Sequence, residues 1–361
     1  MYNFPHTRFA SGWYQIGWGG EFAPGEVRAL RYFDTHLVCY RGQSGGLHVS
    51  DAFCPHFGAH LGYGGTVEDD CIRCPFHGWK WGPDGCNEEI PYSRPEKMNL
   101  RLRQWDVAEV DGLVLLWFGA EGEPPSWEPP SFLPENTSLE GDFWPVYPDC
   151  ADTWTDLRFP PQVMAENSGD AAHFRYVHGA AEVPEIIGFE EAGHRFSTHF
   201  SVRYGGGRAS TWATPKGPVD GRMTTIMHGI GIAAGIIESF DTVYTLATTT
   251  PIDQHTSDHR ATVWVPRTRG DGSPLDESVR DRWAHQQRSQ HAADLPVWEN
   301  MTYVARPMFA KAETKVFRAL RRWIEGLYPD SPATADRDTA ESPAATPGAP
   351  ARTVGAGSGA P

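Results

Sequence analysis

The sequence lacks the features that mark several large classes of protein. Its 361 residues contain no run of 18 or more apolar residues, and its N-terminus lacks the apolar segment of a signal peptide. These absences predict a cytoplasmic protein without a membrane span. Lysine and arginine number 31 against 46 acidic residues, so the formal net charge is −15. Phosphate binding needs clustered basic side chains, and this balance argues against a nucleic-acid partner. The six cysteines do not form a disulfide framework in a chain of this length.

Four potential metal ligands stand in two short motifs. Cys54 is followed by His56, and after 17 further residues Cys74 is followed by His77. This C-x-H-x17-C-x2-H pattern supplies the two cysteines and two histidines of a Rieske [2Fe–2S] cluster, in which the histidines replace cysteines on one iron. Structural zinc is the alternative, but zinc fingers usually group their cysteines apart from their histidines. The pattern therefore favours a Rieske cluster.

Two further cysteines, Cys71 and Cys86, lie close to the second motif. Pairing Cys71 with Cys74 as C-x2-C ligands would leave His77 without a role and break the symmetry of the two motifs. We therefore interpret Cys71 and Cys86 as small, partly buried thiols.

A second pair of histidines, His173 and His178, lies in a predicted helical segment over residues 165–178. Five residues advance an ideal helix by about 500°, so the two rings would point about 140° apart. Convergence on one ion requires a helix break or a π-type bulge, and Gly179 can end the helix. Two histidines and a carboxylate form the facial triad of non-haem Fe(II) oxygenases, which leaves open positions for dioxygen and substrate.

The sequence around the first two motifs resembles a known family. The segments CPHFGAHL at 54–61, CPFHGW at 74–79 and IPY at 90–92 are similar to the Rieske domain of non-haem iron oxygenases. Within that family they resemble the branch of 3-ketosteroid 9α-hydroxylase oxygenase components and cholesterol 7-desaturases. Phe57 stands where many aromatic-ring dioxygenases carry arginine. The chain is therefore expected to lie outside the aromatic-ring branch.

The resemblance implies an α+β fold with two domains. An all-β Rieske [2Fe–2S] domain with an N-terminal lead-in is expected over residues 1–125. A helix-grip (Bet v 1-like) catalytic domain, with a large antiparallel sheet and flanking helices, is expected over 126–330. Residues 331–361 are rich in Ser, Pro, Ala, Thr and Gly and are predicted to be disordered.

The resemblance also assigns the mononuclear iron site. It implies that Fe(II) is bound by His173, His178 and a downstream carboxylate, for which Asp294 is our choice and Glu299 the fallback.

Asp170 and Asn167 precede these histidines in the family pattern N-x2-D-x2-H-x4-H. Asp170 is expected to share a helix face with His173 and to accept its second ring N–H. In the family, the corresponding aspartate links the iron site to a cluster histidine of a neighbouring subunit in a ring-shaped trimer, so a homotrimer is implied. Asn167 is interpreted as a polar group near the iron.

Electrons must come from another protein, because the sequence has neither a Rossmann G-x-G-x-x-G after a strand nor a plant-type ferredoxin motif. The resemblance implies an NAD(P)H-dependent flavin and iron–sulfur reductase, with or without a ferredoxin, and O2 as co-substrate. The predicted function is the terminal oxygenase component of a Rieske monooxygenase that hydroxylates a hydrophobic, steroid-like polycyclic substrate.

Three alternatives are kept. One is a tailoring oxygenase that hydroxylates, desaturates or demethylates another polycyclic or aromatic metabolite. A second is a Rieske electron-transfer protein, although the positions of its extra disulfide cysteines are here Ala59 and Phe76. The third is a regulatory protein that does not bind iron.

Residue patterns predict the remaining elements. Aromatic and β-branched runs predict strands at 12–18, 29–33, 36–40 and 112–118 and further strands between 196 and 267, and the proline-rich segment 121–134 predicts an extended connection. Helices are expected over 277–293 and 310–327. Residues 227–237 are either the lining of an apolar pocket or an ordinary buried strand, and His285 and His291 are predicted to face solvent.

Overall fold

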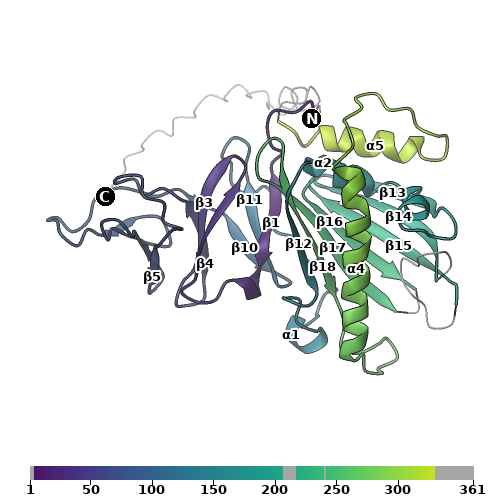
Figure 1. Cartoon of the computed structure of the whole chain (residues 1–361), viewed down its shortest axis with the longest axis horizontal. Coiled ribbons are helices and arrows are strands. Elements are labelled where there is room, and N and C mark those ends of the chain that lie inside the picture. The colour runs from purple at the N-terminus through teal and green to yellow at the C-terminus, as the bar shows by residue number, and fades with distance from the viewer. Residues whose placement is uncertain (1–3, 206–216, 240, 330–361) are drawn as a thin grey trace, which may run out of the picture.

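The computed structural model of the chain describes residues 4–205, 217–239 and 241–329. The described residues form two halves that lie side by side (Figure 1). One half consists of short strands, and the other is a long antiparallel sheet with helix α4 lying across it. None of the helices in this part of the chain is long and apolar enough to cross a membrane.

The N-terminal half is built from three small sheets, with strand orders β1-β11-β10, β2-β3-β4-β9 and β5-β6-β7-β8. A single turn of 3-10 helix, η1, covers Gly19–Glu21. All four strands predicted in this half are present. The strands are β1 Gly12–Trp18, β2 Val27–Tyr32, β3 Thr35–Arg41, β4 Leu47–Asp51, β5 Thr66–Glu68, β6 Cys71–Arg73, β7 Lys80–Trp81, β8 Asn87–Glu89, β9 Gln104–Trp105, β10 Val107–Val110 and β11 Leu113–Phe118.

The C-terminal half contains a seven-stranded sheet with the order β12-β18-β17-β16-β15-β14-β13, in which every neighbouring pair is antiparallel. This sheet confirms the predicted fold class. Its strands are β12 Ala151–Leu157, β13 Glu185–Ala192, β14 Arg195–Tyr204, β15 Val219–His228, β16 Ile232–Glu238, β17 Thr242–Pro251 and β18 Ser257–Trp264. The helices are α1 Leu139–Asp142, α2 Pro161–Asn167, α3 His173–Tyr176, α4 Glu277–Trp298 and α5 Thr314–Glu325.

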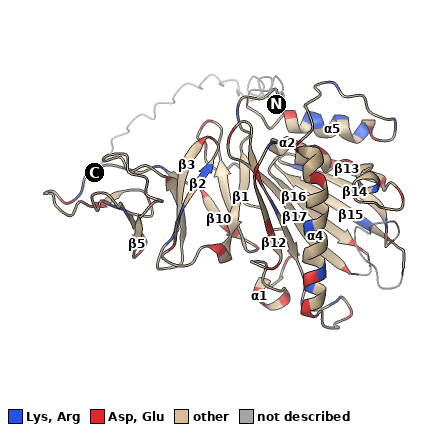
Figure 2. Ribbon diagram, viewed as in Figure 1, with Lys and Arg blue, Asp and Glu red and all other residues tan. Residues whose placement is uncertain are grey.

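Helix α4 covers the face of the sheet beside β18 (Figure 1). Its buried side combines the apolar Val279, Trp283, Leu295 and Trp298 with the polar Gln287, His291 and Asp294. Lys and Arg are interspersed with Asp and Glu over both halves of the ribbon, and both signs occur on α4 (Figure 2). Burial of the apolar side chains of α4 fixes its position on the sheet.

Three helix predictions differ from the structure in extent. Helix α4 continues to Trp298 rather than ending at residue 293, and α5 begins at Thr314 rather than 310. The predicted helix over 165–178 is instead two short helices, α2 and α3, separated by a turn. Gly169 in that turn lies under α5, where a Cβ would come within 2.9 Å of Leu320 Cδ2. Close packing of α5 therefore accompanies the break.

The connection over residues 121–134 contains no helix or strand, as its prolines predicted. It is nevertheless packed in place, because Trp127 stacks on His194 with ring centroids 4.5 Å apart. The domain boundaries at residues 125 and 330 stay a prediction, and the tail over 331–361 lies outside the described residues.

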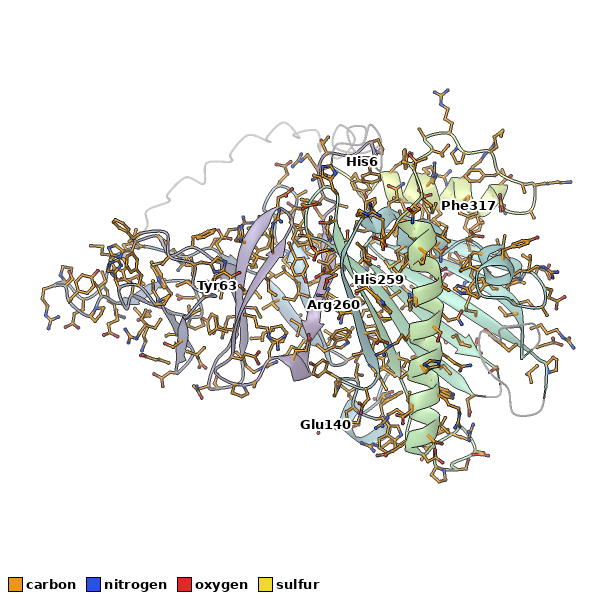
Figure 3. The ribbon with its side chains drawn as sticks, in the orientation of Figure 1. His6, Tyr63, Glu140, His259, Arg260 and Phe317 are labelled. Atoms are coloured by element: carbon orange, nitrogen blue, oxygen red, sulfur yellow. The ribbon has the colours of Figure 1, made fainter. Side chains whose placement is uncertain are left out.

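A buried polar network joins the two halves. Arg260 of β18 donates to the Gln15 backbone oxygen at 3.1 Å and to Tyr32 Oη at 2.7 Å. Tyr32 donates in turn to Asp258 at 2.7 Å, and Thr248 donates to Gln15 Oε1 at 2.8 Å. Figure 3 shows Arg260 between the halves, with Tyr63 in the strand-rich half. A buried charge is tolerated only when it is paired and hydrogen-bonded, and here each half supplies partners to the other.

His228, at the end of β15, should make folding pH-dependent. Burial, and secondly Arg195, lowers the pKa of His228 to about 3, whereas an unfolded histidine titrates near 6.5. The unfolded chain therefore binds more protons below pH 6.5, and stability falls as the pH falls through this window. We expect this residue alone to cost about 2 kcal/mol between pH 7 and pH 5.

Urea unfolding at the two pH values measures this effect. His228→Asn should lose less stability on acidification than the native chain, and His255→Asn, a matched exposed histidine in the turn before β18, should behave like the native chain. Equal losses in the native and His228→Asn proteins would contradict the prediction.

Candidate metal centres and active-site cavity

The two cysteine–histidine motifs fold into the same backbone turn. The N–H of Cys54 donates to the Ala59 oxygen and the N–H of Gly58 donates to the Cys54 oxygen, both at 2.9 Å. The second motif repeats these bonds between Cys74 and Trp79 at 2.8 Å and between Gly78 and Cys74 at 3.1 Å. Both glycines have positive φ, 76° and 74°, which favours glycine at these positions. The two cysteines therefore occupy equivalent positions in the two turns, although His56 follows its cysteine by two residues and His77 by three.

The side chains of these motifs suit an iron–sulfur cluster. Both cysteines are buried, and the rings of His56 and His77 lie 4.7 Å apart between centroids. Burial, with the neighbouring Cys74, raises the pKa of Cys54 to about 11, yet a metal-bound thiol loses its proton outright. His77 Nδ1 is buried without a hydrogen-bond partner among the described residues. A metal ligand role would satisfy this nitrogen.

The second pair of histidines converges because the helix breaks. Both Val177 and His178 donate their N–H groups to the His173 oxygen, at 2.7 and 3.4 Å, and the second bond spans five residues as in a π-type turn. Gly179 follows with a φ of 70°. The two imidazole rings lie 5.0 Å apart between centroids. The bulge that the spacing required is thus present.

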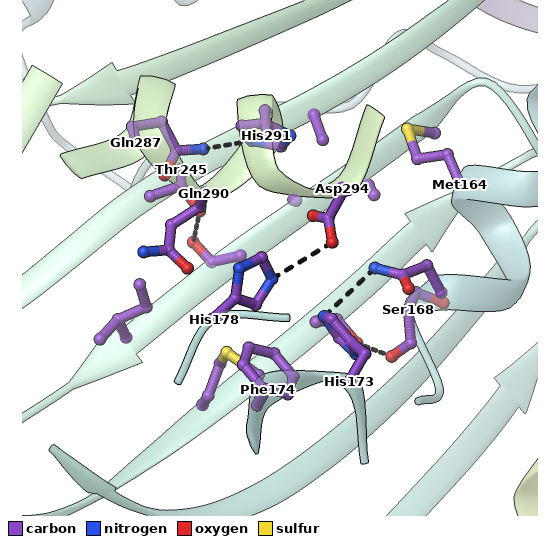
Figure 4. A pocket seen from close by; sticks show the side chains of 18 of the residues that line it. Met164, Ser168, His173, Phe174, His178, Thr245, Gln287, Gln290, His291 and Asp294 are labelled. Atoms are coloured by element: carbon purple, nitrogen blue, oxygen red, sulfur yellow. Dashed lines mark hydrogen bonds and ion pairs between the residues drawn. The ribbon is translucent and has the colours of Figure 1, made fainter. Parts of the chain in front are cut away.

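Asp294 completes a group of three potential ligands. It projects from α4 toward the two histidines (Figure 4), and its Oδ1 lies 3.4 Å from His178 Nε2. One ligand atom from each of His173, His178 and Asp294 lies within 4.8 Å of the others. Burial lowers the pKa of His173, and the negative charge of Asp294 partly offsets this by raising it. Two neutral imidazoles and one carboxylate are the donor set that Fe(II) takes in a facial triad.

Asp170 holds His173 differently from the prediction. It precedes α3 and does not share a helix face with His173. Its Oδ1 accepts the N–H groups of Ala172 and His173 at 2.8 and 3.2 Å, while its backbone oxygen lies 2.7 Å from His173 Nδ1. A backbone carbonyl, rather than the carboxylate, thus accepts the ring hydrogen, because the turn before α3 brings that carbonyl under the ring. His173 Nε2, which faces Asn167, is therefore the ring nitrogen that could bind a metal.

Of the remaining two predicted residues, one lies next to the three potential ligands and the other does not. Asn167 is close, with Nδ2 3.3 Å from His173 Nε2. Glu299, the fallback carboxylate, is outside the group of three and accepts the Arg158 N–H at 3.3 Å. The geometry therefore favours Asp294 over Glu299.

A cavity opens beside the three residues. It offers about 140 Å³ to the centres of water-sized molecules, roughly ten times what one water needs. Its lining includes Ala233, Gly235 and Ile237, so residues 227–237 do contribute to a pocket, while Ile232 of the same segment belongs to the buried core. The remaining wall is mostly apolar, with polar side chains both on α4 and on the sheet, where Tyr204, Thr225 and Thr245 line it. Other lining residues are Met164, Phe174, Val202, Met223, Ala247, Gln287, Gln290 and His291.

His291 contradicts the prediction that it faces solvent, whereas His285 is exposed as predicted. His291 is buried in the cavity wall and hydrogen-bonds to Gln287 at 2.9 Å and to His259 at 3.0 Å. The spacing of His285 and His291 carried no signal of this difference. Only the four-residue interval from Gln287 to His291, one helical turn, places the two side chains on one face.

Comparisons with known proteins identify the two parts of the chain. The profile of the Rieske [2Fe–2S] domain matches residues 12–108, and that of the 3-ketosteroid 9α-hydroxylase C-terminal domain matches residues 116–328. A 3-ketosteroid-9-alpha-monooxygenase oxygenase component from Rhodococcus rhodochrous is 28% identical over 90% of this chain and 85% of its own length. Cholesterol 7-desaturase from Ciona intestinalis is 26% identical over 90% of this chain and 69% of its own length.

Solved structures show the same fold. Apo dicamba monooxygenase superposes with a TM-score of 0.66 and 18% identity, covering 92% of this chain and all of its own. The family match spans more than half of the chain and includes both histidines and Asp294. The chain therefore belongs to the 3-ketosteroid 9α-hydroxylase family and is the oxygenase component of a Rieske non-haem iron monooxygenase.

Proposed function

We propose that this oxygenase uses O2 and electrons from an NAD(P)H-dependent reductase to hydroxylate a steroid-like polycyclic substrate. The observation that carries the proposal is the convergence of His173, His178 and Asp294 on one wall of a largely apolar cavity. A mononuclear iron, when bound there, supplies dioxygen activation next to a C–H bond of the substrate. Cys54, His56, Cys74 and His77 would hold the Rieske cluster that receives the electrons.

The residues around the triad have separable tasks. The Asp170 backbone oxygen fixes the ring of His173, and Phe174 covers the cavity side of that ring, since their centroids lie 4.2 Å apart. Val202, Met223 and Ile237 offer apolar contacts to fused rings and exclude water. The substrate is thereby oriented by shape along the sheet, while its oxidised carbon faces the triad.

We also place the chain in a homotrimer with Asp170 at the contact between subunits. The Asp170 side chain is partly exposed, and within the described part of the chain only its Oδ1 receives backbone N–H groups. The second carboxylate oxygen is then available to a cluster histidine of a neighbouring copy. Mass measurement of the holoprotein in solution tests this assembly, and a monomer with full activity would exclude it.

Product analysis tests the proposed function. The holoprotein, combined with a surrogate ferredoxin reductase system, is supplied with O2, NADH and either a set of steroids or a set of single-ring aromatic acids. We expect product only from the steroids, with oxygen from ¹⁸O2 in the product hydroxyl. Product only from the aromatic acids would overturn the substrate class, and steroid desaturation or demethylation without oxygen incorporation would overturn the reaction type.

A further inference from the structure

Four buried side chains form a hydrogen-bonded chain from the cavity into the core. Gln287 Nε2 lies 2.9 Å from His291 Nε2, and His291 Nδ1 lies 3.0 Å from His259 Nε2. His259 Nδ1 then lies 3.0 Å from Thr249 Oγ1. Figure 4 shows the first of these contacts, between Gln287 and His291 on consecutive turns of α4. The chain thus links α4 to strands β17 and β18.

Both histidines are neutral, so each ring has one donor and one acceptor. Burial lowers the pKa of His291 to about 4, and burial with His291 and Arg260 holds the pKa of His259 well below its usual value. If one nitrogen of a neutral imidazole accepts a hydrogen bond, the other nitrogen of that ring carries the hydrogen and must donate. The hydrogen bonds of the chain therefore all run from donor to acceptor in the same direction, and one cannot reverse unless all of them do.

The core end of the chain sets the direction. Thr249 donates its hydroxyl hydrogen to Met164 Sδ at 3.3 Å, so its oxygen is left to accept from His259 Nδ1. A thioether sulfur can only accept. His259 Nδ1 therefore donates toward the core, His259 Nε2 accepts from His291 Nδ1, and His291 Nε2 accepts from the Gln287 amide.

This direction determines what Gln287 shows to the cavity. Its Nε2 is turned toward His291, and its Oε1 accepts no hydrogen bond from any described residue. That oxygen is also not among the fully buried unpartnered side-chain atoms of the described residues, and Gln287 lines the cavity. The orientation of the amide therefore leaves an acceptor rather than a donor for a molecule bound in the cavity.

We propose that Gln287, held in one orientation by His291, His259 and Thr249, selects substrates that present a hydroxyl donor over substrates that present a carbonyl at the same place. This inference rests on the proposed function, whose substrate class it refines to hydroxylated polycycles. Gln287 precedes Asp294 by seven residues, about 10 Å along an α-helix. The recognised hydroxyl and the oxidised carbon then lie at separate places on the ring system.

The first experiment reads the chain directly. Neutron diffraction from crystals of the deuterated holoprotein shows which ring nitrogens carry a deuteron. We expect deuterons on Nδ1 of both His259 and His291 and none on Nε2. A deuteron on Nε2 of either ring would show that the hydrogen bonds run in the opposite direction. That result would overturn the inference and leave the proposed function unaffected.

The second experiment measures binding by calorimetry, without electrons or turnover. The probes are a 3-hydroxysteroid and its 3-keto counterpart, with 2-decalol and 2-decalone as a smaller matched pair. We expect the alcohol of a pair to bind about tenfold more tightly, because an acceptor that meets a second acceptor in a buried site stays unpaired. Gln287→Leu should bring the ratio close to one. His291→Phe should also lower it by freeing the amide to turn over.

Gln290→Leu is the matched control, since Gln290 lines the same cavity from the same helix but lies outside the chain. It should keep the native preference. Equal or tighter binding of the ketone, or a ratio unchanged in Gln287→Leu, overturns the inference. If only the decalin pair binds and shows the preference, the inference holds and the steroid substrate class fails. If no probe binds, both are overturned.

Discussion

Asp294→Ala is expected to keep its iron–sulfur cluster but to lose its mononuclear iron and its product formation. Asp294 is the only carboxylate in the described group of three ligands, and it is buried against His178. Two imidazoles alone leave the ion without its anionic ligand. Iron should fall from about three to about two per chain with two acid-labile sulfides unchanged, as expected for one [2Fe–2S] cluster and one ion. Product formation should fall by far more than the roughly 100-fold typical of residues outside the ligand set.

Glu299→Ala is the matched control, because it removes the other carboxylate at the end of the same helix. It should retain about three irons and near-native activity. Full iron content in Asp294→Ala, or loss of the ion in Glu299→Ala, would move the ligand role from one carboxylate to the other.

Asp170→Asn is expected to abolish coupled turnover while leaving both metal centres in place. The asparagine oxygen can still accept the N–H groups of Ala172 and His173, and the backbone oxygen still fixes the His173 ring. Only the charge and one acceptor oxygen are removed. Iron, sulfide and the cluster spectrum should match the native protein, whereas product per NADH should fall at least on the order of 100-fold.

Asp170→Ala separates this effect from a structural one. It also removes the bonds to the start of α3, which should cost about 1 kcal/mol of stability, as for lost helix caps. The asparagine variant should not show this loss. Native product yield in Asp170→Asn would remove Asp170 from the electron path and leave it only the role of a backbone cap.

The sequence predicted the chemistry of the site better than its local geometry. Ligand types and spacings identified the cluster motifs, and the five-residue interval between His173 and His178 correctly required a break in the helix. A second interruption, at Gly169 before both histidines, lies under α5, whose Leu320 is about 150 residues further along the chain. No local pattern records that contact, so the separation of α2 from α3 was not predicted.

The buried face of α4 was only partly predictable. The helical pattern of apolar residues along α4 is obscured because Gln287, His291 and Asp294 are polar yet buried. His291 pairs with His259 on β18, and Asp294 pairs with His178, which follows α3. Polar residues on a helix usually mark its solvent side, which explains the wrong prediction for His291. A function that needs polar groups inside an apolar cavity necessarily breaks the pattern that sequence reasoning relies on.

The network around Arg260 limits how this protein can be recombined with its relatives. Gln15 and Tyr32 belong to the strand-rich half, yet they complete the partners of a buried guanidinium in the other half. A chimaera that joined a foreign cluster-bearing half to this sheet would leave Arg260 only Asp258 of its own half, unless it kept a tyrosine in place of Tyr32 and a backbone oxygen in place of that of Gln15. Whether the cluster-bearing half can be exchanged between such oxygenases therefore depends on a few buried positions where the two halves meet, rather than on the length of the connecting segment.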